Sequence, residues 1–454
     1  MKKLLCALLC LAMTVAMFGC SSSSNEGSPT ASDGGSSSQT SADGGESSEA
    51  PAEKIKMRLL SASITESPGG AVEQEIIDDF LELHPEIDLE VIGISSNDHY
   101  TKLTAMVTAN DIPDVFSSLP NSILQFNDMG VIEPLNDLLG EEYMAGWLDY
   151  IEECYLDGQL LYAPWSSIPT SIIYRKDWVE EKGLELPKTW DECTEFFKAL
   201  TEDTDGDGKI DRYGLVLLGA PTASSANRFM PMMKNCGASD LRIDENGNYV
   251  TDINTPGGIA MLNYYYQWAN VDKVVPPGAG EIDNKVAFNL LSTEQAACVI
   301  FGPQAIATIE SQNPDLKGKF AGAPFPTLDG SPSVTVPGFY GFSISSKSEH
   351  KELGAEYIKF LLSKDNFVKF SKVTYRLPTR ADSVEATLEA NPFLEGFYEA
   401  TKSCYIKTLA PFTVEIDNAI AVGFNLLASG AETDAAKVAA DLEQQINDII
   451  AANT

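Results

Sequence analysis

Strands and helices follow one another along the chain from about residue 54. Apolar residues over 55–59 alternate with basic ones, which predicts a half-buried strand. Between Val72 and Leu81 the apolar residues recur with helical spacing, and Pro85 ends that helix because the residue before a proline avoids the helical region. The same two patterns then predict a strand over 87–91, a helix over 103–107 and a short strand at 115–116.

This alternation predicts an α/β fold with parallel strands and right-handed crossovers. Ligands of such sheets bind at the loops that follow the carboxyl ends of the strands. Here those loops are polar and cover residues 61–70, 95–99 and 117–121. Each loop alone is equally compatible with a solvated turn, but three loops on one edge favour a surface that faces a ligand.

The later part of the chain continues the α/β pattern. Thr189 and Glu192 form a capping box that predicts a helix start. Trp178 and Trp190 stand at predicted helix starts and are expected in the core, whereas Trp165 lies in a loop rich in proline and serine and is a candidate platform for a ligand. Further strands are predicted over 171–174, 296–301 and 341–344, and helices over 353–362, near 415–428 and over 434–451.

The N-terminus has the pattern of a secretion signal. Residues 1–19 join two lysines to a short apolar stretch, and Met17-Phe18-Gly19-Cys20 resembles a lipobox, in which Cys20 is lipidated. Residues 20–53 follow with abundant serine and glycine and no large apolar side chain, which predicts a disordered tether. The alternative is an ordinary secretory signal that ends near a cysteine.

Charge and missing motifs narrow the function. The 454 residues include 66 Asp and Glu against 31 Lys and Arg, a net charge of −35, which argues against nucleic acid and against anionic lipid as partners. The three histidines occur in unrelated contexts, and no nucleophile elbow, zinc-protease, Walker A or dinucleotide motif is present. We expect that the protein is not an enzyme, although a pair of carboxylates for glycoside cleavage could be hidden among so many acidic residues.

An acidic loop over 203–211 has the spacing of a calcium loop. Asp203, Asp205, Asp207 and Asp211 fall at its positions 1, 3, 5 and 9, and the carbonyl of Lys209 falls at position 7. The usual glutamate at position 12 is replaced by a glycine. The sequence therefore predicts a weak structural Ca²⁺ site and requires no other cofactor; a solvated acidic loop is the alternative.

Five segments in order resemble the family 1 extracellular solute-binding proteins, the carbohydrate receptors of ABC importers. The segments are FLELHPEIDLEV (80–91), YTKLTAMVTANDIPDVF (100–116), YAPWSSIPTSIIYRKDWVEEKGLELPKTWDE (162–192), AACVIFGPQAI (296–306) and VPGFYGFSISSKSEHKELGAEYIKFLLS (336–363). The aromatic residue of the family's Gly-Pro-Trp is Gln304 here, which removes one stacking platform for a sugar ring.

The resemblance implies a two-lobe fold of the periplasmic-binding-protein type II, with discontinuous lobes joined by a hinge of several strands. The expected first lobe comprises 54–165 and about 332–380, and the second comprises 166–331 and about 381–454. The ligand would bind in the cleft, and closure of the lobes would trap it there. The side chains expected to contact it are Glu66, Asn97, Ser118, Asn121, Trp165, Asn227, Gln304, Tyr340 and Arg376.

The resemblance also implies partners and a location. We expect a sugar or oligosaccharide as ligand, ABC permease subunits as membrane partners, a monomer, and a lipid anchor on the extracellular face of the cell membrane. A receptor for a non-sugar solute, a secreted glycoside hydrolase or lyase, and a structural surface lipoprotein or adhesin remain as alternatives.

Overall fold

The computed structural model describes residues 53–96 and 98–454. The predicted signal over 1–19, the predicted lipid site at Cys20, nearly all of the predicted tether over 20–53, and the candidate ligand residue Asn97 lie outside the described residues. The helices and strands below therefore begin with the strand that opens near Lys54.

A six-stranded mixed sheet forms the centre of the first lobe. Its first three strands are parallel, as the sequence predicts, and they lie in the order β2, β1, β3. Strand β14 then pairs antiparallel with β3, β4 and β7. The strands are β1 (Ile55–Ser61), β2 (Ile87–Gly93), β3 (Val115–Ser118), β4 (Ile132–Glu133), β7 (Ala163–Ser167) and β14 (Phe339–Ser345).

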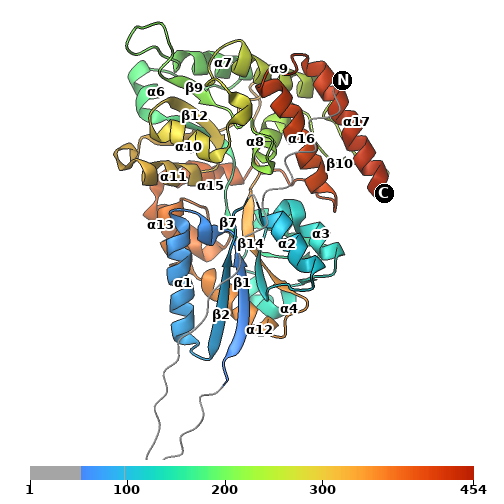
Figure 1. Ribbon diagram of the computed structural model, residues 1–454. Helices are drawn as coiled ribbons and strands as arrows, with labels where there is room; N and C mark the ends of the chain where they lie inside the picture. The colour runs from blue at the N-terminus through green and yellow to red at the C-terminus, as the bar shows by residue number, and fades with distance from the viewer. Residues whose placement is uncertain (1–52, 97) are drawn as a thin grey trace, which may run out of the picture. The chain divides into compact units, whose positions relative to one another are not determined.

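Helices cover this sheet, with α1 on one side of β1 and β2 and with α2 and α3 on the other (Figure 1). Phe80 of α1 packs edge-on against Tyr357 of α12, which buries the apolar face that the sequence pattern predicts. The helices are α1 (Gly69–Leu83), α2 (His99–Thr108), α3 (Pro120–Asp128), α4 (Asn136–Leu139), α5 (Glu141–Met144), α12 (Lys351–Leu361) and α13 (Lys364–Thr374).

A separate four-stranded sheet forms the centre of the second lobe, in the order β13, β8, β12, β9. Strand β12 is apolar along its whole length and buried, as expected of a central strand with helices on both faces. The strands are β8 (Ser171–Arg175), β9 (Tyr213–Val216), β12 (Ala296–Phe301) and β13 (Phe320–Ala323), with a small hairpin made by β10 (Arg242–Ile243) and β11 (Tyr249–Val250). A second small hairpin, made by β5 (Tyr155–Leu156) and β6 (Gln159–Leu160), packs on the core of the first lobe.

The helices of the second lobe include the predicted C-terminal pair, α16 and α17, which lie side by side and pack on α9 (Figure 1). Helix α7 begins with the predicted capping box of Thr189 and Glu192. The helices are α6 (Lys176–Lys182), α7 (Trp190–Ala199), α8 (Ala223–Lys234), α9 (Pro256–Asn270), α10 (Asn284–Ser292), α11 (Gln304–Gln312), α14 (Val384–Ala390), α15 (Glu395–Thr401), α16 (Thr413–Ala428) and α17 (Ala435–Asn453).

Separate hydrophobic cores confirm the two-lobe α/β fold. One core draws on residues 57–165 and 339–370, and two others on residues 172–325 and 375–446. Tyr375 and Leu377 pack with the second lobe, although the predicted first lobe runs to about 380. The residue boundaries of the lobes therefore stay a prediction, while the discontinuity of each lobe follows from these cores.

Two local predictions need correction. The segment around Trp165 is a strand, β7, and not a loop, because its residues pair antiparallel with β14, with a shift in register at Trp165. Several helices also have no counterpart among the sequence predictions, namely α3, α4, α5, α8, α10, α11, α13, α14 and α15.

Candidate functional site

Three short segments join the two lobes and hydrogen-bond to one another. Ser167 and Leu377 exchange two backbone hydrogen bonds of 2.9 Å. The hydroxyl of Thr335 donates to the carbonyl of Thr170 over 2.6 Å. Because segments 167–170, 335–339 and 376–380 run beside one another here, we call this region the crossover. Side chains next to the crossover therefore lie close to both lobes.

The first-lobe wall of the crossover is a cluster of buried polar groups at the carboxyl end of β1. The backbone N–H groups of Ala62 and Ser63 donate to the Tyr340 hydroxyl over 3.1 and 2.9 Å. Ser61 donates to Oε1 of Glu73 over 2.6 Å. Burial raises the pKa of Glu73 to about 7, because its hydroxyl donors offset only part of the cost of burying a charge.

Arg376 joins this wall from the third crossing segment. Its Nη2 donates to Oε2 of Glu66 over 2.6 Å, and its guanidinium lies 5.3 Å from the ring centre of Tyr340. Ser96 donates to the other oxygen of Glu66 over 2.6 Å. Three predicted ligand residues, Glu66, Tyr340 and Arg376, are therefore neighbours at the crossover, although they come from distant parts of the sequence.

Asn121 contacts the second lobe directly. Its Nδ2 lies 3.5 Å from Oδ2 of Asp417 on α16, whose other oxygen accepts from Lys407 over 2.7 Å. Asp240 lies 3.5 Å from the same ammonium group. The Asn121 contact joins the lobes through side chains, next to a buried cluster of one cation and two carboxylates.

Two other predicted ligand residues lie inside the first lobe. Ser118 is buried, and its hydroxyl is 2.7 Å from that of Ser343. The indole of Trp165 is fully buried and stacks on Phe370 at 3.9 Å. In this structure the Trp165 ring therefore has no free face for a sugar, and the prediction that it is a platform loses its support.

The second-lobe wall holds Asn227, Gln304 and their neighbour Arg228. Asn227 and Arg228 lie on α8, and Gln304 begins α11 directly after β12. Nη1 of Arg228 donates to Oγ1 of Thr170 in the crossover over 2.7 Å. Its guanidinium lies 3.9 Å from the ring centre of Phe301, the last residue of β12. The crossover thus brings α8 and the end of β12 together.

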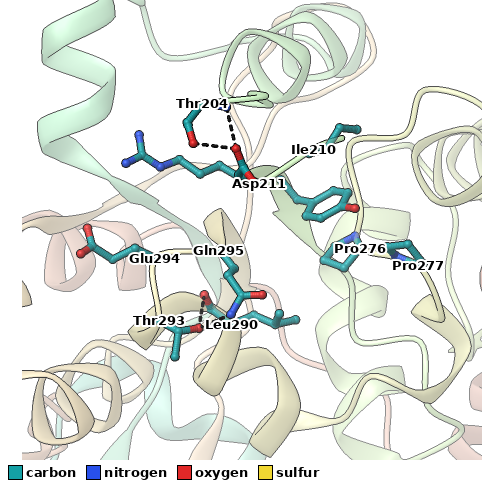
Figure 2. A pocket seen from close by; sticks show the side chains of 11 residues that line it. Thr204, Ile210, Asp211, Pro276, Pro277, Leu290, Thr293, Glu294 and Gln295 are labelled. Carbon is teal, nitrogen blue, oxygen red and sulfur yellow. Dashed lines mark hydrogen bonds between the residues drawn. The ribbon is translucent and has the colours of Figure 1, made fainter. Parts of the chain in front are cut away.

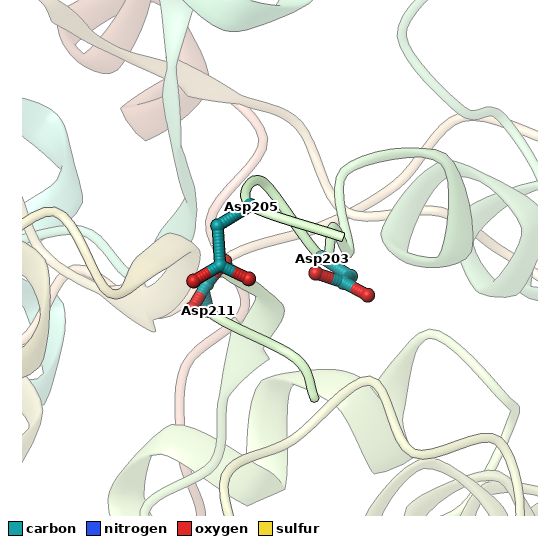
Figure 3. Close-up of side chains that lie close together, drawn as sticks. All are labelled: Asp203, Asp205 and Asp211. Carbon is teal, nitrogen blue, oxygen red and sulfur yellow. The ribbon is translucent and has the colours of Figure 1, made fainter. Parts of the chain in front are cut away.

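The predicted calcium loop brings only part of its ligand set together. Carboxylate oxygens of Asp203, Asp205 and Asp211 lie within 4.8 Å of one another, and all three side chains are exposed (Figure 3). The carboxylate of Asp207 instead forms an ion pair of 2.8 Å with the Lys209 ammonium. The loop can therefore offer a cation three carboxylates on one side.

A surface depression lies beside this loop (Figure 2), and none of its lining residues belongs to the crossover segments. Its lining includes Pro276, Pro277 and Gln295, and Thr204 donates to Asp211 at its rim. No residue of this lining belongs to the predicted ligand set. We therefore take the crossover as the candidate functional site.

Sequence analysis missed four charged residues of this region, namely Glu73, Arg228, Lys407 and Asp417. Arg228 carried a recognisable signal, because it is a basic residue directly before the apolar FMPMM stretch of its helix in a very acidic chain. Glu73 and Asp417 had none, since the chain offers 66 acidic residues, and Lys407 had none because only tertiary contacts distinguish a buried lysine from a surface one.

A family comparison decides the class of the protein. The model of the bacterial extracellular solute-binding proteins matches residues 63–366, which is well over half of the chain. The chain belongs to this family. Two curated relatives are the multiple sugar-binding protein of Streptococcus mutans, 25% identical over 66% of this chain and 70% of its own length, and the diacetylchitobiose binding protein DasA of Streptomyces coelicolor, 25% identical over 70% and 72%.

Solved structures confirm the two-lobe fold of this solute-binding protein. An ABC transporter solute-binding protein from Thermotoga lettingae, bound with α-D-tagatose, superimposes with a TM-score of 0.77 at 21% identity and covers 88% of this chain and 100% of its own. Maltose-bound MalE3 of T. maritima has a TM-score of 0.75 at 21% identity and covers 86% and 99%.

Proposed function

We propose that this extracellular solute-binding protein captures a sugar or oligosaccharide between its lobes and delivers it to the permease of an ABC importer. Support comes from the family, from relatives that are named for sugars, and from structural neighbours that hold sugars. The observation that carries the proposal is the crossover, where polar side chains of both lobes meet within hydrogen-bonding distance.

Closure supplies the mechanism. A ligand that contacts both walls stabilises the closed arrangement by the difference between its affinities for the closed and open states. Its hydroxyls need partners, and each buried polar group left unpaired costs about 1–3 kcal/mol, which rejects poorly matched sugars. The permease would then recognise the closed form.

Calorimetry and small-angle scattering test the proposal together. We expect one class of saccharide to bind and to reduce the radius of gyration of the purified chain. Binding of only a non-sugar solute would contradict the sugar assignment and leave the receptor assignment intact. Turnover of the bound saccharide would contradict the expectation from the sequence that the chain is not an enzyme, and it would favour the glycoside-active alternative.

We further propose that the chain works as a monomer held at the outer face of the membrane by lipid on Cys20. The lipobox-like sequence supports the anchor. No helix within residues 53–96 and 98–454 combines the length and the apolarity needed to cross a bilayer. We expect the Cys20→Ala protein to be released into the medium, whereas the unchanged protein should stay with the membranes. Equal retention of the two proteins would contradict the lipid anchor.

We also propose that the 203–211 loop binds Ca²⁺ weakly as a structural ion. The three converging carboxylates support this, because hard cations prefer oxygen ligands and the grouped charges repel one another otherwise. The hydrogen bonds of Asp203 to the N–H groups of Gly206 and Gly208 hold the loop in a tight turn.

A further inference from the structure

Arg228 stands apart from the other arginines of the chain, all of which lie in the described residues. Each of the others has a carboxylate within ion-pair distance, and they are Arg58, Arg175, Arg212, Arg242, Arg376 and Arg380. Arg228 has none within residues 53–96 and 98–454. In a chain with a net charge of −35, a cation without a carboxylate partner needs a physical explanation.

The surroundings of Arg228 are apolar or neutral. Its single hydrogen bond among the described residues goes to Thr170, and its Nε is buried without an acceptor. Burial lowers the pKa of the guanidinium to about 10, so the group stays charged at neutral pH. A desolvated charge without a counter-charge is costly, and an anion that arrives from outside would remove that cost.

Phe301 and Gln304 complete this part of the wall. The Phe301 ring supports one face of the guanidinium at 3.9 Å and so limits the planes in which its N–H groups can donate. The side-chain oxygen of Gln304 is buried without a donor and lies over Gly302, beside the carbonyl of Ile168. The guanidinium of Arg228 and the free side-chain oxygen of Gln304 therefore both lie beside segment 167–170.

We propose that Arg228 receives a carboxylate of the ligand, so that the saccharide captured by this protein carries a uronic acid residue. This rests on the proposed function. A planar guanidinium fork matches a carboxylate through two parallel N–H···O bonds, and Nε is one of the donors without a partner. The free oxygen of Gln304 would accept a hydroxyl of the same sugar.

The acidity of the chain makes such a local cation necessary. A net charge of −35 repels an anionic sugar, but salt screens that repulsion beyond about 8 Å at physiological ionic strength. Attraction at short range then depends on the groups that the ligand touches. The Arg228 guanidinium supplies that attraction, and no carboxylate of the described residues competes for it.

Calorimetry with matched pairs of sugars tests this directly. The titrants are di- and trisaccharides of galacturonate, glucuronate and mannuronate, each against the neutral oligosaccharide of the same linkage, with the full purified chain. We expect at least one acidic sugar to bind more than about tenfold tighter than its neutral counterpart. Arg228→Gln should weaken that binding by about 10- to 100-fold and should reduce the preference for the acidic over the neutral sugar to less than about threefold.

Two variants control for charge and for folding. Arg242→Gln removes the same charge from an exposed ion pair with Asp252 and should leave acidic-sugar affinity unchanged. Arg228→Lys keeps a charge without the fork, should give intermediate affinity, and replaces Arg228→Gln in the test if the latter fails to fold.

Three outcomes would overturn the inference. Binding of neutral sugars with no preference for acidic ones leaves the proposed function standing and removes the role of Arg228. Equal loss of acidic and neutral sugars in Arg228→Gln shows that Arg228 only positions the wall. Binding of neither sugar class contradicts both proposals.

Discussion

The two walls of the crossover treat their buried polar groups differently. On the first-lobe wall, Ser61, Ser63, Glu73 and Tyr340 hydrogen-bond to one another or to nearby backbone. On the second-lobe wall, Arg228 and Gln304 keep buried polar atoms without partners in the described residues. Nε of Arg376 on the first-lobe wall is also buried without an acceptor, but Arg376 has Glu66 as its counter-charge, whereas Arg228 has no carboxylate partner within residues 53–96 and 98–454.

The second lobe is nevertheless able to pair its charges. Close to the crossover it buries Lys407 between Asp417 and Asp240, at 2.7 and 3.5 Å. The missing counter-charge of Arg228 is therefore a local property and not a general feature of this lobe. The two walls therefore differ in whether their cation has a carboxylate partner, and the uronic acid proposal rests on that difference.

Removing the cation of the paired cluster should have the largest effect. Lys407→Met leaves the buried carboxylates of Asp417 and Asp240 without compensation, and we expect a loss of about 3–5 kcal/mol in the free energy of unfolding. Urea denaturation measures it. Lys402→Met is the control, because Lys402 pairs with Glu399 on the surface and should cost less than about 1 kcal/mol. Equal costs would show that the cluster is not desolvated.

Glu73 should make the first-lobe wall sensitive to pH. Its pKa is raised from 4.5 to about 7, so the folded state holds a proton that the unfolded state releases. The stabilisation is complete below about pH 4.5 and is lost as the pH rises towards 7, by about 3 kcal/mol in total. Glu73→Gln, which cannot ionise, should therefore gain stability relative to the unchanged protein between pH 5 and pH 8.

Urea midpoints of the two proteins across this pH range measure the effect. Glu75→Gln on the same helix is the control, because Glu75 forms only a surface pair with Lys369 and should shift stability by less than about 1 kcal/mol at either pH. A constant difference between Glu73→Gln and the unchanged protein would show that Glu73 does not retain a proton on folding.

Calcium binding should have the smallest effect on the free energy of unfolding and should not change either wall of the crossover. The hydrogen bonds of Asp203 and Asp211 stay within the 203–211 loop. An ion at ten times its dissociation constant adds about 1.4 kcal/mol to the free energy of unfolding. We expect the melting temperature to rise with Ca²⁺ against EGTA, and Asp203→Asn to abolish the rise without changing sugar affinity. No rise in millimolar Ca²⁺ would favour the solvated acidic loop.

Much of the fold could be predicted from local patterns. The parallel strands β1, β2 and β3, the apolar strand β12 and the capped start of α7 lie where the alternation of residues and the Thr189 capping box place them. The Trp165 platform lost its support for the opposite reason, because the exposure of a ring depends on what packs against it, and Phe370 lies far away in the sequence.

The sequence by itself determined the strongly periodic elements, the α/β class and the absence of familiar catalytic motifs, because periodicity and spacing are properties of neighbours along the chain. Only the tertiary structure decided which charges are satisfied. Arg228, Thr170 and Phe301 meet because three segments converge on the crossover, and the pairing of a charge depends on what surrounds it in space.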